Sequence, residues 1–179
     1  MQNLYNFKLP EGFRGKSMVY VQLWWLVQAT LFRCSPQFAY NFRAFLLRLF
    51  GAKVGLKTVI RPTATITYPW KVEIGDYSWI GDDVVLYSLG NIKIGANVVI
   101  SQRSYLCAAD HDYKQADFPI RSFPIIVEDQ AWLATDVFVS PGVTIGHNSV
   151  IGARSSVFKS MPAGMVCMGS PCRVVKKRE

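Results

Sequence analysis

Residues 143–157 read V-T-I-G-H-N-S-V-I-G-A-R-S-S-V, and the spacing of their aliphatic residues is unusual. Ile145, Ile151 and Val157 lie six residues apart, and a glycine follows each of the two isoleucines. An α-helix repeats every 3.6 residues and a β-strand every two residues, so neither period alone places an aliphatic side chain at every sixth position. The stretch therefore indicates a chain that completes one structural unit in six residues.

The six-residue period extends over most of the chain from residue 54 onward. Val127, Leu133 and Val139 lead into Ile145 in the same register. Three shorter series have the same spacing: Val54, Ile60 and Ile66; Ile74, Ile80 and Leu86; Ile94, Ile100 and Leu106. Glycine follows the aliphatic residue at positions 55, 75, 81, 95, 146 and 152. Short insertions separate the series, and one long interruption lies between residues 106 and 127.

Such hexapeptide repeats predict a parallel β-helix. Each hexapeptide supplies one short strand and one turn, and three of them close a triangular coil of about 18 residues with its aliphatic side chains inside. A single coil cannot bury a core, but a stack of coils can. A β-sandwich would instead show a period of two with turn signals every 8–12 residues. We therefore expect an all-β fold of about five coils, at residues 54–71, 74–91, 94–111, 127–144 and 145–162.

Residues 1–50 differ from the repeats, and we expect them to be helical. One apolar run extends from Ser17 to Arg33, and a second candidate helix runs from Phe38 to Phe50. The apolar core of the first run has about 15 residues, whereas a membrane-spanning helix needs about 20. The first 57 residues hold eight Lys/Arg and one acid, which gives +7 of the formal net charge of +8.

Two interpretations of residues 1–50 remain open from the sequence. The segment can cap the first coil and pack on a partner subunit, because the end of a β-helix exposes apolar columns and unpaired strand edges. It can also lie on an anionic membrane surface as an amphipathic element. In the second case the expected contacts are Trp24, Trp25 and Phe42 for the interface, and Arg33, Arg43 and Arg48 for the lipid charge.

The long interruption, loop 107–124, is the expected place for chemistry, since a loop that breaks a regular scaffold usually has a function. It contains His111, which is flanked by Asp110 and Asp112. A carboxylate or carbonyl bound to one ring nitrogen fixes the tautomer and makes the other nitrogen a better base. His111 is therefore the candidate general base, whereas His147 lies at a repeat corner and has no expected role.

The four cysteines, Cys34, Cys107, Cys167 and Cys172, lack the spacing of a metal site or disulfide framework, so free thiols are expected. A Cys107–His111 acyl-enzyme pair is a rival to the general base. The register of Leu106 argues against it, because it places Cys107 at a repeat corner. Residues 1–17 show no signal-peptide pattern. We expect a cytoplasmic protein, with the inner face of the membrane as a partner under the second interpretation.

Several segments resemble those of the hexapeptide-repeat acyltransferases, which fold as left-handed β-helices. Within that family the similarity is greatest to the colanic-acid biosynthesis O-acetyltransferases. The segments are W-W-L-V-Q-A-T-L-F at 24–32, I-T-Y-P-W-K at 66–71, G-D-Y-S-W-I-G-D-D-V-V-L-Y at 75–87, I-S-Q-R-S-Y-L-C at 100–107, H-D-Y at 111–113 and G-S-P-C-R-V-V at 169–175. Together they span nearly the whole chain. The resemblance implies an acetyl-CoA-dependent O-acetyltransferase that acts on a sugar hydroxyl in exopolysaccharide or other surface glycan biosynthesis, without a metal.

The resemblance also implies an assembly and a set of roles. The family forms homotrimers with acetyl-CoA in the clefts between prisms, and residues 51–179, with a basic C-terminal tail, form the acyltransferase domain. His111 matches the catalytic base. Residues at coenzyme-contact positions are Trp132, Thr135, Ala153, Lys159, Arg173 and Lys176. On the acceptor side we expect Tyr87, Ser88, Asp110 and Asp112. This side departs from the family pattern in two places: Asp110 stands where the family often has Ser or Thr before the base, and Tyr87 and Ser88 replace an acceptor-side amide or carboxylate.

Other functions on the same fold stay open. A zinc carbonic anhydrase needs about three protein ligands, and two histidines do not supply them. A non-catalytic β-helix scaffold would not bind acetyl-CoA, and an acetyltransferase with a non-saccharide small-molecule acceptor would. The expected partners are acetyl-CoA, a saccharide acceptor and two further copies of the chain, and no nucleic acid.

Overall fold

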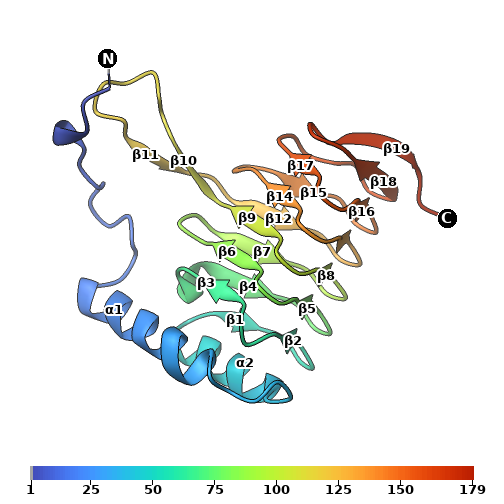
Figure 1. Ribbon diagram of the computed structural model, residues 1–179, viewed down its shortest axis with the longest axis horizontal. Coiled ribbons are helices and arrows are strands. Elements are labelled where there is room, and N and C mark those ends of the chain that lie inside the picture. Colours follow the sequence, from blue (N-terminus) through green and yellow to red (C-terminus); the bar gives the residue numbers. More distant parts are fainter. Residues whose placement is uncertain (1) are drawn as a thin grey trace.

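The computed structural model describes residues 2–179 and contains a parallel β-helix with helices at its N-terminal end (Figure 1). Met1, the first residue of the predicted N-terminal segment, lies outside the described residues. The strands of successive coils stack into three parallel sheets, which confirms the predicted architecture.

Each sheet collects one strand from each coil. The first sheet orders β1 (Lys53–Val54), β4 (Val72–Ile74), β7 (Ile92–Ile94), β12 (Ile125–Val127) and β15 (Thr144–Ile145). The second orders β2 (Val59–Ile60), β5 (Trp79–Ile80), β8 (Val99–Ile100), β13 (Trp132–Leu133), β16 (Val150–Ile151), β18 (Met165–Met168) and β19 (Arg173–Lys177). The third orders β3 (Thr65–Ile66), β6 (Val85–Tyr87), β9 (Tyr105–Cys107), β14 (Phe138–Val139) and β17 (Ser156–Val157).

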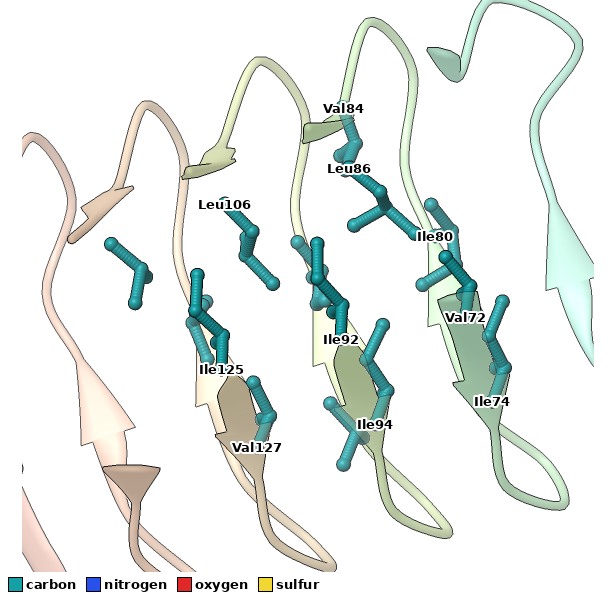
Figure 2. Close-up of a cluster of buried hydrophobic side chains, with 14 of the residues drawn as sticks. Val72, Ile74, Ile80, Val84, Leu86, Ile92, Ile94, Leu106, Ile125 and Val127 are labelled. Atoms are coloured by element: carbon teal, nitrogen blue, oxygen red, sulfur yellow. The ribbon is translucent and has the colours of Figure 1, made fainter. Parts of the chain in front are cut away.

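The period-six aliphatic residues form the interior of the prism, as predicted. In the first sheet Ile74 lies opposite Ile94, and Ile94 lies opposite Val127, so their side chains stack from coil to coil (Figure 2). Every predicted inward position except the half-buried Val54 is at most 3% exposed. Since each coil buries its apolar side chains against the coils above and below, the stack behaves as one continuous core.

The coil count is closer to six than to the predicted five. Met161 bridges Ile145, and β18 pairs in parallel with β16, so a partial sixth coil follows residue 157. The sequence hides this coil because the inward positions after Val157 shift by two residues, to Met161 and Cys167. The basic C-terminal tail is also ordered, as β19 pairs antiparallel with β18.

The N-terminal helices cover the open end of the first coil (Figure 1). The helical elements there are η1 (Leu4–Asn6), α1 (Met18–Val27), the π-helical η2 (Gln28–Phe32) and α2 (Tyr40–Leu49), and η3 (Pro69–Lys71) follows the first coil. Trp24, Phe32 and Leu47 are at most 1% exposed and belong to the same core as the prism interior. The indole Nε1 of Trp24 donates to the carbonyl of Ile66 at 2.8 Å. Trp24 is therefore part of the cap, and its predicted contact with lipid is wrong.

Arg43 is also buried rather than exposed to a membrane surface. Its side chain is 0% exposed, and its Nε donates to the carbonyl of Ile60 at 2.6 Å. The two terminal nitrogens donate to Ser35 Oγ and to the carbonyls of Pro36 and Gln37 at 2.6–2.8 Å. Burial lowers the pKa of the guanidinium, and these acceptors compensate for the lost water. Arg43 thus fixes α2 to the first coil.

The interruption of the repeat is a hairpin that projects from the prism. Strands β10 (Ala109–His111) and β11 (Ile120–Ser122) pair antiparallel with each other (Figure 1). The N-terminal arm, residues 2–17, extends from α1 toward the tip of this hairpin, and the Asn3 N–H donates to the Ala116 carbonyl at 2.7 Å. Among residues 2–179, no helix combines the length and apolar character needed to cross a bilayer.

Candidate active site

His111 lies at the end of β10, and its ring is held by a backbone carbonyl. The Nδ1 atom is 2.8 Å from the carbonyl oxygen of Phe118. A carbonyl oxygen only accepts hydrogen bonds, so Nδ1 carries the proton and donates. The tautomer leaves Nε2 as the free proton acceptor, which is the arrangement that a general base requires.

Two aromatic side chains that the sequence did not mark enclose the imidazole. The ring of Phe118 stacks on His111 with centroids 4.3 Å apart and an interplanar angle of 7°. The ring of Phe7, from the N-terminal arm, lies 5.9 Å from His111 on centroids. The φ angle of Phe118 is +49°, which a bulky residue rarely adopts, and in this conformation its carbonyl and its ring both meet His111.

The two aspartates that flank His111 bind Arg121 instead of the imidazole. Arg121 makes two hydrogen bonds of 2.9 Å to Asp110, and its guanidinium is 3.5 Å from Asp112. The hydrogen bond to Asp110 raises the pKa of Arg121, and hydrogen bonds from Lys114 and Gln115 lower the pKa of Asp112. Of the two orienting groups that the sequence left open, a carboxylate or a carbonyl, the structure therefore has the carbonyl, and the Arg121 cluster joins β10 to β11.

Cys107 lacks the features of an acyl-enzyme nucleophile. Its Sγ donates to the carbonyl of Ala109 at 3.1 Å, and burial raises the pKa of the thiol. A nucleophilic cysteine needs the opposite shift, because the thiolate is the reactive form.

The expected acceptor residues Tyr87 and Ser88 have different surroundings. Ser88 is 0% exposed, and its hydroxyl bonds to both the N–H and the carbonyl of Tyr68. Its expected contact with an acceptor is therefore wrong, because the hydroxyl joins two coils in the interior. Tyr87 is half-buried on the outer side of the third sheet, 5.9 Å from the ring of Tyr105, and burial raises the pKa of its phenol.

The expected coenzyme residues gather around the late coils. Thr135 and Ala153 occupy the same corner one coil apart, since the Arg154 N–H donates to the Thr135 carbonyl at 2.8 Å. Arg173 pairs with Met168, whose Cβ lies 2.9 Å from the position that a Cβ on Gly152 would take. Thr135, Ala153 and Arg173 are therefore brought together.

The remaining two cations lie to either side of that corner. Lys176 pairs with Val166 in the second sheet. Lys159 follows β17, on the prism edge from which the hairpin leaves after β9. Lys159, Arg173 and Lys176 are all exposed. Exposed cations beside a small corner residue suit the phosphates and the narrow pantetheine chain of coenzyme A.

Trp132 lines a groove that the sequence did not reveal. Its indole is 45% exposed on the second sheet and donates to Ser101 Oγ at 3.0 Å. Trp79, 55% exposed, lies two coils away in the same column, with Val99 between the two. The open groove has a volume of about 650 Å³ and polar groups at its margin, among them Arg61, Asp82, Ser101 and Gln102. The repeat register could have found it, because both tryptophans immediately precede an inward aliphatic residue of one column.

Within a single chain, the candidate base lies apart from the expected coenzyme residues of β18 and β19. The hairpin β10–β11 projects from one side of the prism, whereas β18 and β19 lie at the far end of the stack (Figure 1). Within residues 2–179, no group of three or more His, Cys, Asp or Glu side chains could hold a metal ion.

Comparison with known proteins places this geometry in a family, although no family model matches the chain. The chain is 60% identical over 178 residues to WcaF of Escherichia coli (strain K12), whose name assigns it as a colanic acid biosynthesis acetyltransferase; the match covers 99% of this chain and 98% of the relative. It is 31% identical over 173 residues to the galactoside O-acetyltransferase of the same organism, covering 94% of this chain and 80% of that protein.

Solved structures agree with these relatives. Galactoside acetyltransferase in complex with coenzyme A has a TM-score of 0.84 at 27% identity, over 96% of this chain and 85% of that chain. The hexapeptide-repeat acetyltransferase VCA0836 of Vibrio cholerae O1 biovar eltor, in complex with acetyl-CoA, has a TM-score of 0.81 at 27% identity, over 90% and 88% of the chains. The fold is thus the left-handed β-helix that the resemblance implied. The chain belongs to the hexapeptide-repeat acetyltransferases, in the colanic acid biosynthesis (WcaF) group, and is an acetyl-CoA-dependent acyltransferase.

Proposed function

We propose that the chain transfers the acetyl group of acetyl-CoA to a hydroxyl of a saccharide used in surface polysaccharide biosynthesis, with His111 as general base. The hydrogen bond from His111 Nδ1 to the Phe118 carbonyl carries this proposal, because it leaves Nε2 able to accept a proton. The names of the relatives, a colanic acid acetyltransferase and a galactoside O-acetyltransferase, support a sugar hydroxyl as the acceptor.

The reaction is a direct transfer. His111 Nε2 takes the proton of the acceptor hydroxyl, and the oxygen forms a bond to the thioester carbonyl carbon. A backbone N–H of the cleft donates to the developing oxyanion. The carbon–sulfur bond then breaks, and His111 returns its proton to the departing thiolate. The Phe118 carbonyl holds the imidazolium in place between the two proton transfers.

Six residues are assigned to acetyl-CoA. Arg173, Lys176 and Lys159 pair with its phosphates, and the small Ala153 lets its chain approach the prism. Thr135 lies on the same corner, and Trp132 lies on the adjoining sheet.

The active unit in this proposal is a homotrimer. The hairpin of one chain lies against the coenzyme corner of its neighbour, so that each cleft combines His111 of one subunit with Arg173 of the next. The projection of the hairpin away from its own β18 and β19 supports this arrangement (Figure 1).

The Trp79 end of the groove is the proposed acceptor site, whereas its Trp132 end is assigned to acetyl-CoA. Sugars present apolar C–H faces and a rim of hydroxyls, which match aromatic walls and a polar margin. Tyr87, Asp110 and Asp112 stay predicted acceptor contacts. The reaction takes place in the cytoplasm in this proposal, and the four free cysteines agree with a reducing compartment.

Acetyl transfer to saccharides tests the proposal directly. The protein is incubated with acetyl-CoA and a panel of lipid-linked, nucleotide-linked and polymeric saccharides, and thiol release and product mass are measured together. An acetylated saccharide with one CoA per ester supports the proposal. An acetylated non-saccharide, with no saccharide modified, would replace the acceptor class, and CoA release without any ester would leave only hydrolysis.

A further inference from the structure

The outer side of the helical cap exposes an unusual number of apolar side chains. We call this set the apolar end face. Its nine members are 41–81% exposed: Met18, Val19, Leu23, Leu26, Leu31, Phe38, Phe42, Phe45 and Leu49. Single exposed apolar residues are ordinary on a protein surface, but a cluster of this size indicates a partner.

Capping the prism does not account for the apolar end face. The cap needs only the inner side of each helix, and in α1 Val21 and Trp24 supply it, both 0% exposed. The outer positions of α1 stay exposed although they are apolar: Met18, Val19, Leu23 and Leu26. In α2 the inner side carries Ala44, Leu46 and Leu47, whereas Phe42, Phe45 and Leu49 follow the opposite side at helical spacing. Both helices are therefore apolar on two sides.

The charge around the apolar end face has one sign. Residues 12–72 contain no Asp or Glu and nine Lys or Arg. Lys16 precedes α1, Arg33 follows η2 and Arg48 lies in the last turn of α2, and all three are exposed. Within the described chain, the Arg33 guanidinium has neither a hydrogen bond nor an ion pair, so its charge is available to a partner. The matching partner is apolar inside and anionic at its surface.

We infer that the apolar end face docks on an anionic lipid bilayer, with α1 and α2 lying in the plane of the interface. Helices that lie in the interface insert about 5–10 Å, to the boundary between headgroups and acyl chains. The phenylalanines are suited to that depth, and Lys16 and Arg33 supply the charges that meet the headgroups. Arg48 is instead held by the carbonyls of Val54 and Gly55 at 2.9 and 2.8 Å. In a trimer with parallel prisms the three end faces would point the same way, so that binding to the bilayer would be multivalent.

Co-sedimentation with vesicles tests this inference without any acetyl transfer. The full-length protein is mixed with phosphatidylcholine vesicles that contain phosphatidylglycerol, and with phosphatidylcholine alone. Binding is expected with the anionic vesicles and should fall as salt approaches about 0.5 M, because screening shortens the reach of the cations. A protein that stays in the supernatant with anionic vesicles at low salt overturns the inference, and its acetyltransferase activity would be unaffected by that result.

Two sets of substitutions separate the apolar and electrostatic parts. Replacing Val19, Leu26 and Phe45 by Asn is expected to weaken vesicle binding about tenfold or more per side chain. Lys16→Gln with Arg33→Gln should weaken it about 30-fold, at about fivefold per cation. The matched controls are exposed residues elsewhere, Tyr5→Ser with Val175→Asn and Lys93→Gln with Lys177→Gln, which should bind like the unmodified protein.

A second copy of the chain is the alternative partner of the apolar end face, in which case two molecules would associate through their cap ends. Light scattering without lipid would then show a larger particle that the Val19, Leu26 and Phe45 substitutions return to the smaller size. That result, together with no vesicle binding, would assign the apolar end face to a second copy and overturn the lipid inference. Melting curves of each variant establish that the fold is kept, and the lipid and salt dependence of the unmodified protein stands independently of them.

Discussion

The prism and the hairpin β10–β11 hold their residues in different ways. In the prism, the strands of the middle coils pair with a coil on each side, and every predicted inward side chain except the half-buried Val54 is at most 3% exposed. In the hairpin, two strands pair only with each other, and residues 113–117 at the tip are exposed. Substitutions of inward side chains in the prism should therefore lower the stability of the fold, whereas substitutions in the hairpin should leave the fold intact. Under the proposed function, the chemistry belongs to the hairpin and the stability to the prism.

His111→Ala should remove activity while leaving the prism intact. Losing a general base lowers turnover by about 10²–10⁴-fold, and the melting temperature should hardly change, because His111 is only half-buried in the hairpin. His147→Ala, at an exposed prism corner, is the control and should retain full turnover. Steady-state kinetics and a melting curve of each variant check the prediction. Near-normal turnover of His111→Ala would remove it from the role of base.

The converse test is Ile94→Ala inside the prism. Ile94 is 1% exposed, and truncating such a side chain costs about 2–5 kcal/mol of the free energy of unfolding. Turnover per folded molecule should be unchanged. Lys93→Ala, on the same strand but exposed, should cost less than about 0.5 kcal/mol. Denaturant unfolding of both variants measures the difference, and equal midpoints would contradict a prism that carries the stability.

Arg173→Ala examines the coenzyme corner. Loss of one charge-assisted contact with a phosphate should raise the KM for acetyl-CoA about tenfold with a smaller change in kcat. Lys177→Ala, in the same strand, is the control. Initial rates at varied acetyl-CoA distinguish the two parameters, and an unchanged KM would move the phosphates away from Arg173. Lys176→Ala should likewise raise the KM for acetyl-CoA with a smaller change in kcat.

Two similar ion pairs lie in the two regions, one in the hairpin and one in the prism, and their removal should have only small effects. Arg121 binds Asp110 across the hairpin with two bonds of 2.9 Å, and Arg103 binds Asp136 across two coils with two bonds of 2.8 Å. Exposed pairs of this kind contribute at most about 1 kcal/mol, so Arg121→Gln and Arg103→Gln should both leave the melting temperature almost unchanged.

Only Arg121→Gln should lower kcat/KM, by about fivefold at most, since it loosens the hairpin that positions His111. Both variants are assayed under identical conditions. An equal decrease in kcat/KM in the two variants would show a general effect of lost charge and not of hairpin position.

The interior of the prism could be predicted from the sequence because it depends on a local rule. An inward position recurs every six residues, so Ile60, Ile100 and Val139 are recognised without knowing what they contact. The rule fails where the register changes, as it does between Val157 and Met161, and the partial sixth coil was missed for that reason.

The surroundings of the candidate site could not be predicted in this way. His111 is bound by a backbone carbonyl, which every residue possesses and which no side-chain pattern reveals. Phe7 reaches it from more than 100 residues away in the chain. Arg43 reads as a surface charge, yet carbonyls of Pro36, Gln37 and Ile60 make its burial favourable. Ser88 was misassigned for a similar reason, because its partners are the backbone groups of Tyr68.

The stacking of coils also fixes distances along the prism axis in regular steps. The hairpin leaves after β9, in the third coil, and each coil adds one strand spacing of about 4.8 Å. The root of the hairpin therefore stands about 10 Å above the first coil along the prism axis, a height set by the number of intervening coils and by no individual side chain. Removing or adding one whole coil below the hairpin would change that height in a single step of about 4.8 Å while leaving the contacts of His111 within the hairpin as they are.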